Sequence, residues 1–184
     1  MSRTAAHIPV IPVLAVMTAL LAFTSLMIGP TGIGFGGSAE ARWLILSEIR
    51  LPRTLLGLLI GGALGLSGAA LQGYLRNPLA EPGVIGISGG AGLGAVLAIH
   101  SGFAGAFAIG LPIGGLAGAA AAMGIVLWLA GTRGGPITLI LSGVAVASLT
   151  TALIALVLTL SQNPFAAVEI VYWLMGSLTD RSMT

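Results

Sequence analysis

The chain has 184 residues, of which 57% are hydrophobic and only 7% are charged, whereas about 25% of the residues of a soluble domain are charged. This composition excludes a water-soluble globular protein. The absence of cysteine, with only two histidines, also excludes a disulfide framework, a thiolate nucleophile and the usual zinc or iron–sulfur sites, so we expect no metal and no cofactor.

The few charged residues divide the chain into long apolar runs. Four uncharged runs cover residues 4–39, 54–75, 82–132 and 134–168. Because a transmembrane helix needs about 20 apolar residues, these runs have room for one, one, two and one spans in turn. The sequence therefore predicts an all-α fold, a polytopic transmembrane helical bundle. We expect spans near residues 8–28, 54–74, 84–99, 112–130 and 137–160, and a short partial helix at 165–178.

The ends of these segments carry recognisable signals. The first apolar run is longer than the core of a secretory signal peptide, which favours a first span over a cleaved leader. The stretch 38–48 contains Trp43 between charged residues, a pattern typical of an interfacial segment rather than a span. Pro78 stops the second span, because proline cannot continue a helix, and a turn at 131–136 separates the last two.

The arginines do not fix the orientation. Five spans place the two termini on opposite sides of the membrane. If the N-terminus is cytoplasmic, three arginines face the cytoplasm (Arg3, Arg76 and Arg133) and four face outward (Arg42, Arg50, Arg53 and Arg181). This distribution goes slightly against the positive-inside rule. The outward position of four arginines therefore needs an explanation other than topology, such as binding to an acidic partner.

The distribution of the arginines also bears on nucleic-acid binding. Because they are scattered singly along the chain, the sequence predicts no nucleic-acid partner.

Small residues recur every four positions in three of the expected spans. They are Gly57, Gly61, Gly65, Ala69 and Gly73 in the second span, Gly86, Gly90, Gly94 and Ala98 in the third, and Gly110, Gly114, Gly118 and Ala122 in the fourth. Such stripes let helix backbones approach closely in lipid. They predict packing within the bundle, with a contact between subunits as the alternative.

Candidate catalytic groups are sparse. Residues 86–90 match the G-x-S-x-G pattern, which raises an intramembrane serine protease as a remote alternative. His100 follows Ser88 by twelve residues on one span, about 18 Å along a helix, which is too far for a base. Buried polar groups are better candidates for a pathway: Ser67, Gln72, Ser88, Ser142, Ser148, Thr150 and Thr151. Each serine or threonine hydroxyl can instead form a hydrogen bond with the backbone of its own helix. Gln72 is harder to explain in this way and is therefore the strongest candidate of the set.

The segment from Arg50 to Leu97 resembles the FecCD-type permeases, which are the membrane subunits of ABC importers for iron-siderophore, haem and cobalamin. The matching elements are residues 50–53 (RLPR), Ser67-Gly68 with Gln72, residues 77–82 (NPLAEP), residues 86–91 (GISGGA), residues 141–144 (LSGV) and residues 172–177 (YWLMGS). The run from Asn77 to Pro82 with its upstream Gln72 is the most specific of these.

The resemblance implies roles for several residues. A cytoplasmic N-terminus would place Arg50 and Arg53 outside, where the family's arginines receive acidic residues of a substrate-binding protein. Anchoring of helix ends at the lipid interface is the alternative. Gln72, Asn77 and Leu79 would lie at the cytoplasmic mouth of the pathway, although an asparagine before proline also starts a local turn. The fifth span, with Ser142, Ser148 and Thr151, would line the pathway.

The resemblance also implies partners and a missing half. Family members have about ten spans in two related halves, so residues 1–184 are expected to form an N-terminal half that does not transport alone. Two permease copies, separate ATPase subunits and a binding protein would act together in the bacterial cytoplasmic membrane on an iron-chelate ligand. The chain has no phosphate-binding loop and is not expected to be an enzyme. The alternative function is that of a half-size membrane channel or an assembly partner.

Overall fold

The computed structural model describes residues 9–29, 32–33, 38–107, 109–161, 163–176 and 178. The all-α prediction is confirmed: within these residues the regular secondary structure is helical apart from one pair of two-residue strands. The chain divides into two compact units, residues 1–62 with 178–184, and residues 63–177. Each unit is described by itself.

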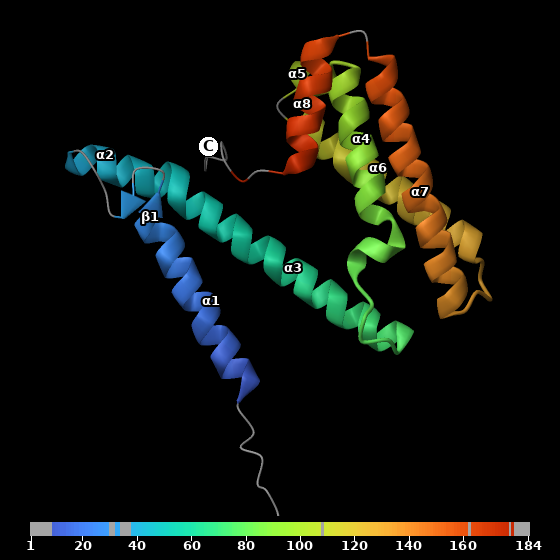
Figure 1. The fold of residues 1–184 in the computed structure, drawn as a ribbon, viewed down its shortest axis with the longest axis horizontal. Helices are drawn as coiled ribbons and strands as arrows, with labels where there is room; N and C mark the ends of the chain where they lie inside the picture. The colour runs from blue at the N-terminus through green and yellow to red at the C-terminus, as the bar shows by residue number, and fades with distance from the viewer. Residues whose placement is uncertain are drawn as a thin grey trace, which may run out of the picture. The chain divides into compact units, whose positions relative to one another are not determined.

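The first unit begins with helix α1 (Val10–Met27). Strand β1 (Ile28–Gly29) follows α1 directly (Figure 1) and pairs antiparallel with β2 (Gly32–Ile33). Helix α2 (Ala39–Leu44) starts at Ser38, whose side chain accepts a hydrogen bond from the backbone N–H of Ala41. It continues without a break through the π-helix η1 (Ile45–Arg50) into α3 (Leu51–Leu75), which extends into the second unit.

The continuous helical run from 39 to 75 differs from the expected separation of an interfacial segment and a span beginning near 54. Proline at position 52 removes one backbone donor and would clash with the carbonyl of Glu48 in a regular α-helix. The wider turns of η1 end just before this proline, and the N–H of Leu51 bonds to the carbonyl oxygen of Leu46, five residues back. The π-helical insertion therefore lets the helix pass Pro52 instead of ending there.

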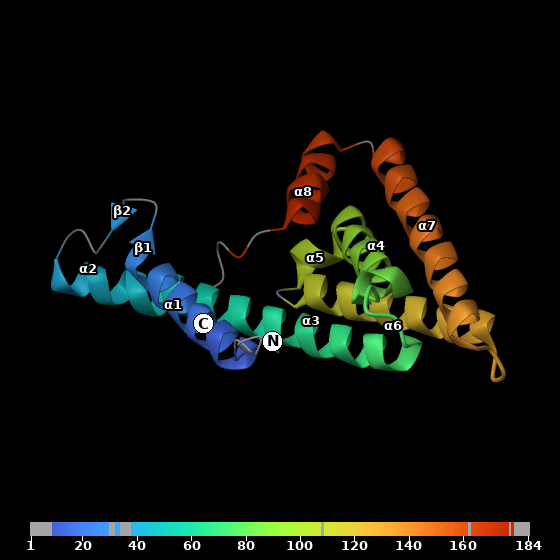
Figure 2. The same cartoon turned by 60° about the horizontal axis from the view of Figure 1, so that its bottom comes forward.

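The second unit is built around one central helix. Its elements are η2 (Pro82–Ile85), α4 (Ile87–His100), α5 (Phe103–Ala106), α6 (Gly110–Ala130), α7 (Pro136–Leu160) and α8 (Pro164–Met175). Helix α4 packs against α6, α7 and α8, and it lies beside α6 in both views (Figures 1 and 2). One buried cluster centres on Val126 and Val146, and a second on Val96 and Ile170.

Four helical segments in the described residues are long and apolar enough to cross a membrane. They are Val10–Met27, Ala39–Leu75, Gly110–Ala130 and Pro136–Leu160. The span expected near 84–99 differs, because Gly86 adopts φ 76° and divides it into η2 and α4. Helix α4 has 14 residues, which rise about 21 Å, less than the roughly 30 Å of hydrocarbon. The segment expected at 165–178 is the 12-residue α8.

Candidate functional site

The two arginines expected to dock a partner lie one helical turn apart in different environments. Arg50 ends η1 and is only 6% exposed. Its Nη1 donates a hydrogen bond of 2.8 Å to the carbonyl oxygen of Leu26 in the last turn of α1. Arg53, in the first turn of α3, is exposed. The structure therefore presents one of these two guanidinium groups on the surface and holds the other inside the first unit.

The turn that follows α3 brings Gln72, Asn77 and Leu79 together. The side-chain amide of Gln72 donates a hydrogen bond of 3.3 Å to the carbonyl oxygen of Ala80, across the turn. Asn77 Oδ1 accepts a hydrogen bond of 2.9 Å from the backbone N–H of Leu79, which is the local Asx turn typical of asparagine before proline. Leu79 is 85% exposed. The turn is thus held from within and presents an apolar side chain at its tip.

The three polar residues predicted on α7 do not share one environment. Ser142 is buried on the face of α7 that also buries Gly143, Val146 and Thr150. Ser148 and Thr151 are exposed on another face, and their hydroxyls donate to the carbonyl oxygens of Val144 and Ala147 on their own helix. The structure therefore separates this exposed pair from Ser142, which faces the interior of the second unit.

The glycines of α4 allow its backbone to touch α6. A Cβ built on Gly90 would lie 2.7 Å from the carbonyl oxygen of Gly118, and one on Gly94 would lie 2.9 Å from the Cα of Gly118. Both distances are shorter than real Cβ contacts. Gly86 approaches α7 instead, because a Cβ there would lie 2.6 Å from the carbonyl oxygen of Gly143.

The glycines of α3 have no such neighbour among the described residues. A Cβ at Gly61 or Gly65 would meet nothing within 4 Å, and one at Gly57 would meet only Leu178 at 4.0 Å. The same four-residue spacing therefore accompanies a tight interface on α4 and an open surface on α3.

Sequence reasoning did not pick out Gly29 or Gly143 as close contacts. A Cβ on Gly143 would lie 2.6 Å from the carbonyl oxygen of Val84. Its signal was present, because Gly143, Ala147 and Thr151 repeat the four-residue spacing of small residues. The contact of Gly29 with Arg50 joins residues far apart in the sequence, and no local sequence pattern predicts it.

Catalytic arrangements find little support in the geometry. Ser88 and His100 lie near opposite ends of α4, so they cannot form a serine–histidine pair. His7, the other histidine, lies outside the described residues. Within the described ranges, no three His, Cys, Asp or Glu residues are grouped to hold a metal ion.

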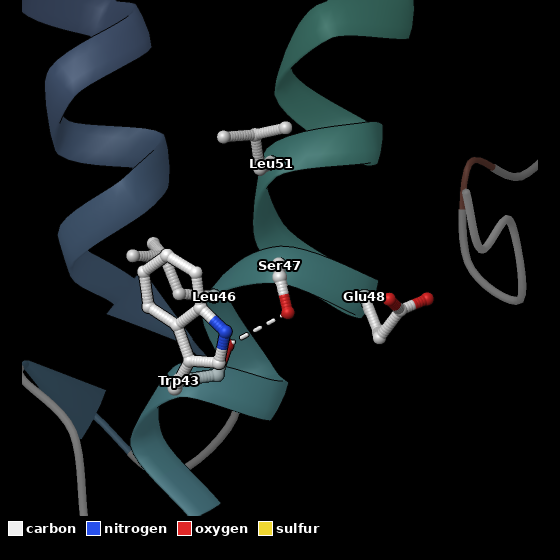
Figure 3. A pocket seen from close by; sticks show the side chains of 5 residues that line it. All are labelled: Trp43, Leu46, Ser47, Glu48 and Leu51. Atoms are coloured by element: carbon white, nitrogen blue, oxygen red, sulfur yellow. Dashed lines mark hydrogen bonds between the residues drawn. The ribbon is translucent and has the colours of Figure 1, made fainter. Parts of the chain in front are cut away.

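A small surface pocket of about 270 Å³ lies at the junction of α2, η1 and α3, lined by Trp43, Leu46, Ser47, Glu48 and Leu51. The hydroxyl of Ser47 is occupied, because it donates to the carbonyl oxygen of Trp43 at 2.9 Å. Figure 3 shows the carboxylate of Glu48 pointing away from the indole ring of Trp43. The pocket thus offers an apolar wall without converging polar groups, and the exposed Trp43 fits a position at the membrane interface.

Comparisons with known proteins give a consistent answer. The model of the FecCD transport family matches residues 13–184. The achromobactin transport system permease protein CbrC of Dickeya dadantii is 39% identical over 175 residues, which cover 92% of this chain and 50% of that protein. The vitamin B12 import system permease protein BtuC of Salmonella paratyphi A is 38% identical, with 89% of this chain and 50% of that protein covered.

A solved structure shares the fold as well. A metal-chelate type ABC transporter in an inward-facing conformation superposes with a TM-score of 0.80 and 31% sequence identity, covering 92% of this chain and 54% of that one. The chain therefore spans about half the length of the curated relatives it matches.

Proposed function

Because this chain belongs to the FecCD transport family, we propose that it forms the N-terminal half of the membrane subunit of an ABC importer. It is a multi-pass membrane protein, and its relatives are transport permeases rather than enzymes. The observation that carries the proposal is the family match over residues 13–184, together with the shared fold at 31% identity. The bacterial cytoplasmic membrane is the location that the family favours.

The proposed cargo is an iron chelate of the siderophore class. The names of the relatives support a bulky, polar ligand: one refers to achromobactin, one to vitamin B12, and the solved structure to a metal chelate. Haem and cobalamin, which are also bulky metal chelates, are the competing ligands. Such a cargo needs a wide pathway, which we place between two permease copies.

The proposed path follows the exposed polar groups. Ser148 and Thr151 of α7 would face the path, and the turn with Gln72, Asn77 and Leu79 would form its cytoplasmic mouth. The exposed tip of this turn and the two internal hydrogen bonds that shape it support that role, because a constriction needs a side chain held in a defined position. Ser142 would lie on the buried face of α7, away from the path, and help to pack this helix within the second unit.

The energy for transport would come from other subunits. The sequence contains no lysine and hence no G-x-x-x-x-G-K-[ST] loop to cradle nucleotide phosphates. Two separate ATPase subunits would drive the alternating access, and an extracytoplasmic binding protein would deliver the ligand at the end of the permease that carries Arg53. Transport would require the second half of the permease fold in addition to residues 1–184.

Reconstitution tests this proposal directly. The permease, with both halves of the fold present, is placed in liposomes with its ATPase, and its binding protein is loaded with a radioactive ferric siderophore, haem or cobalamin. We expect ATP-dependent accumulation of the ferric siderophore that stops when the binding protein is omitted. Accumulation of haem or cobalamin, without accumulation of the ferric siderophore, would identify that molecule as the cargo in place of the siderophore. Failure with all three, in vesicles whose ATPase is active, would overturn the importer assignment.

A further inference from the structure

Arg50 is the most deeply buried charged residue in the described part of the chain, at 6% exposure. A buried guanidinium is tolerated only where hydrogen bonds replace its water. Here Nη1 donates 2.8 Å to the carbonyl oxygen of Leu26, 24 residues earlier in the chain. The burial of Arg50 is therefore linked to an acceptor on another helix.

That acceptor explains why a cation is favourable here. The last carbonyl groups of an α-helix have no partner within the helix, and they form the negative end of its dipole. At the end of α1, the N–H of Ile28 bonds to the carbonyl oxygen of Thr24. Arg50 supplies a donor to Leu26, two residues further on. It acts as a C-terminal cap for α1 that comes from the neighbouring helix.

Gly29 provides the space for this arrangement. A Cβ at Gly29 would lie 2.5 Å from Nη2, 3.0 Å from Cζ and 3.2 Å from Nε of Arg50. The distance to Nη2 is shorter than real Cβ contacts and the other two are tighter than most, so a side chain at this position would shift the guanidinium group that bonds to Leu26. Gly29 and Arg50 therefore form a matched pair in which each residue restricts the other.

Arg53 lies one turn further along the same helix and is exposed. Residues three apart on a helix project from neighbouring positions, so fixing the start of α3 at Arg50 also fixes where Arg53 points. We propose that Arg50 is a positioning residue that fastens the end of α1 to the start of α3, and that, of these two arginines, Arg53 is the one that meets the acidic partner. This inference rests on the proposed function for the partner and on the structure for the fastening.

The first experiment separates the two arginines by salt dependence. Docking of the binding protein from the same transport system is measured on the complete permease–ATPase complex in lipid nanodiscs, from low to high ionic strength. We expect Arg53→Gln to weaken docking about fivefold at low salt, as the loss of one exposed charge pair should, and to flatten the salt dependence. We expect Arg50→Gln to lower the melting temperature of the permease and leave the slope of the salt dependence unchanged.

The second experiment tests the fastening without any partner. Gly29→Ala, Arg50→Gln and the double variant are compared by melting temperature, with Gly61→Ala as a control because a Cβ there meets nothing within 4 Å. We expect both single variants to have a lower melting temperature than the control. We expect the double variant to melt at no lower a temperature than the less stable of the two single variants, because the effects of two coupled residues do not add.

The outcomes distinguish this inference from the proposed function. Additive losses from Gly29→Ala and Arg50→Gln would overturn the fastening, whatever the binding protein does. A flattened salt dependence in Arg50→Gln, with an unchanged melting temperature, would make Arg50 a docking residue and would also overturn it. Coupled losses combined with no docking to the wild-type complex would retain the fastening and reject the partner of the proposed function.

Discussion

Gly94 on α4 and Gly114 on α6 meet backbone to backbone: a Cβ built on Gly114 would lie 2.8 Å from the carbonyl oxygen of Gly94. A Cβ on Gly118, one turn further along α6, would lie 2.9 Å from the Cα and the backbone nitrogen of Gly94. In lipid, where apolar side chains gain nothing by leaving the solvent, such close contact is a main source of helix association. The α4–α6 pair is therefore the part of the second unit most sensitive to added methyl groups.

Gly118→Ala should destabilise the permease. The new methyl group would lie against the backbone of α4 at Gly90 and Gly94, and overpacking of this kind costs about 1–3 kcal/mol. Gly124→Ala, on the same helix, is the matched control because a Cβ there meets nothing within 4 Å, and alanine favours a helix over glycine by up to about 1 kcal/mol. Thermal unfolding in detergent measures both. Equal melting temperatures for the two variants would contradict the tight α4–α6 contact.

Gly86→Ala should be more damaging than Gly102→Ala. Both glycines precede a helix with positive φ, at 76° and 78°, so alanine is strained at either position by about 1–2 kcal/mol. Only Gly86 adds a collision, because its Cβ would lie 2.6 Å from the carbonyl oxygen of Gly143, whereas a Cβ at Gly102 meets nothing within 4 Å.

The difference between the melting temperatures of these two variants isolates the contact of Gly86 with α7. We expect Gly86→Ala to melt at the lower temperature, and its expression in membranes to fall accordingly. If Gly102→Ala is equally damaging, backbone strain alone explains the requirement for glycine at position 86.

The sequence predicted the class of fold well because the signal for a membrane helix is local. Among the described residues, long uncharged runs identified three of the four longest helices, at 10–27, 110–130 and 136–160, and the second part of the fourth, which runs from 39 to 75. Helix boundaries were less accurate where backbone conformation decided them. The left-handed Gly86 divides one expected span, and the π-helix before Pro52 joins a span to its preceding segment. Neither feature has a periodicity that a sequence can reveal.

The environments of the candidate residues were harder to predict. Arg50 and Arg53 look equivalent in the sequence, yet one is buried and the other exposed. Ser142 and Ser148 look equivalent on α7, yet six residues place them on different helical faces, and the neighbours of each face are known only from the fold. The chemical type of a residue can be read directly from the sequence, whereas its burial depends on contacts between residues far apart in the chain.

Asn77→Ala should loosen the turn after α3, and Asn77→Asp should preserve it. Aspartate retains an oxygen that can accept from the N–H of Leu79, the bond seen at 2.9 Å, whereas alanine loses an interaction worth about 1 kcal/mol. Hydrogen exchange at the Leu79 amide measures the difference, with faster exchange expected only in Asn77→Ala. Transport should fall in parallel if this turn forms the mouth of the pathway. Equal protection in both variants would show that the turn does not depend on the side chain of Asn77.

Single cysteines on α7 should reveal which of its faces meets water. The chain contains no cysteine, so Ser142→Cys, Ser148→Cys and Thr151→Cys can each be labelled alone by a charged, membrane-impermeant thiol reagent. Only a thiolate reacts, and a thiol in lipid or in a packed interior does not ionise. In the assembled importer we expect labelling at positions 148 and 151, which are exposed in the structure. We expect none at the buried position 142, the matched control. Added ligand should slow the labelling of Thr151→Cys. Protection of positions 148 and 151 from the reagent in every state would place that face against lipid or another helix and remove it from the pathway.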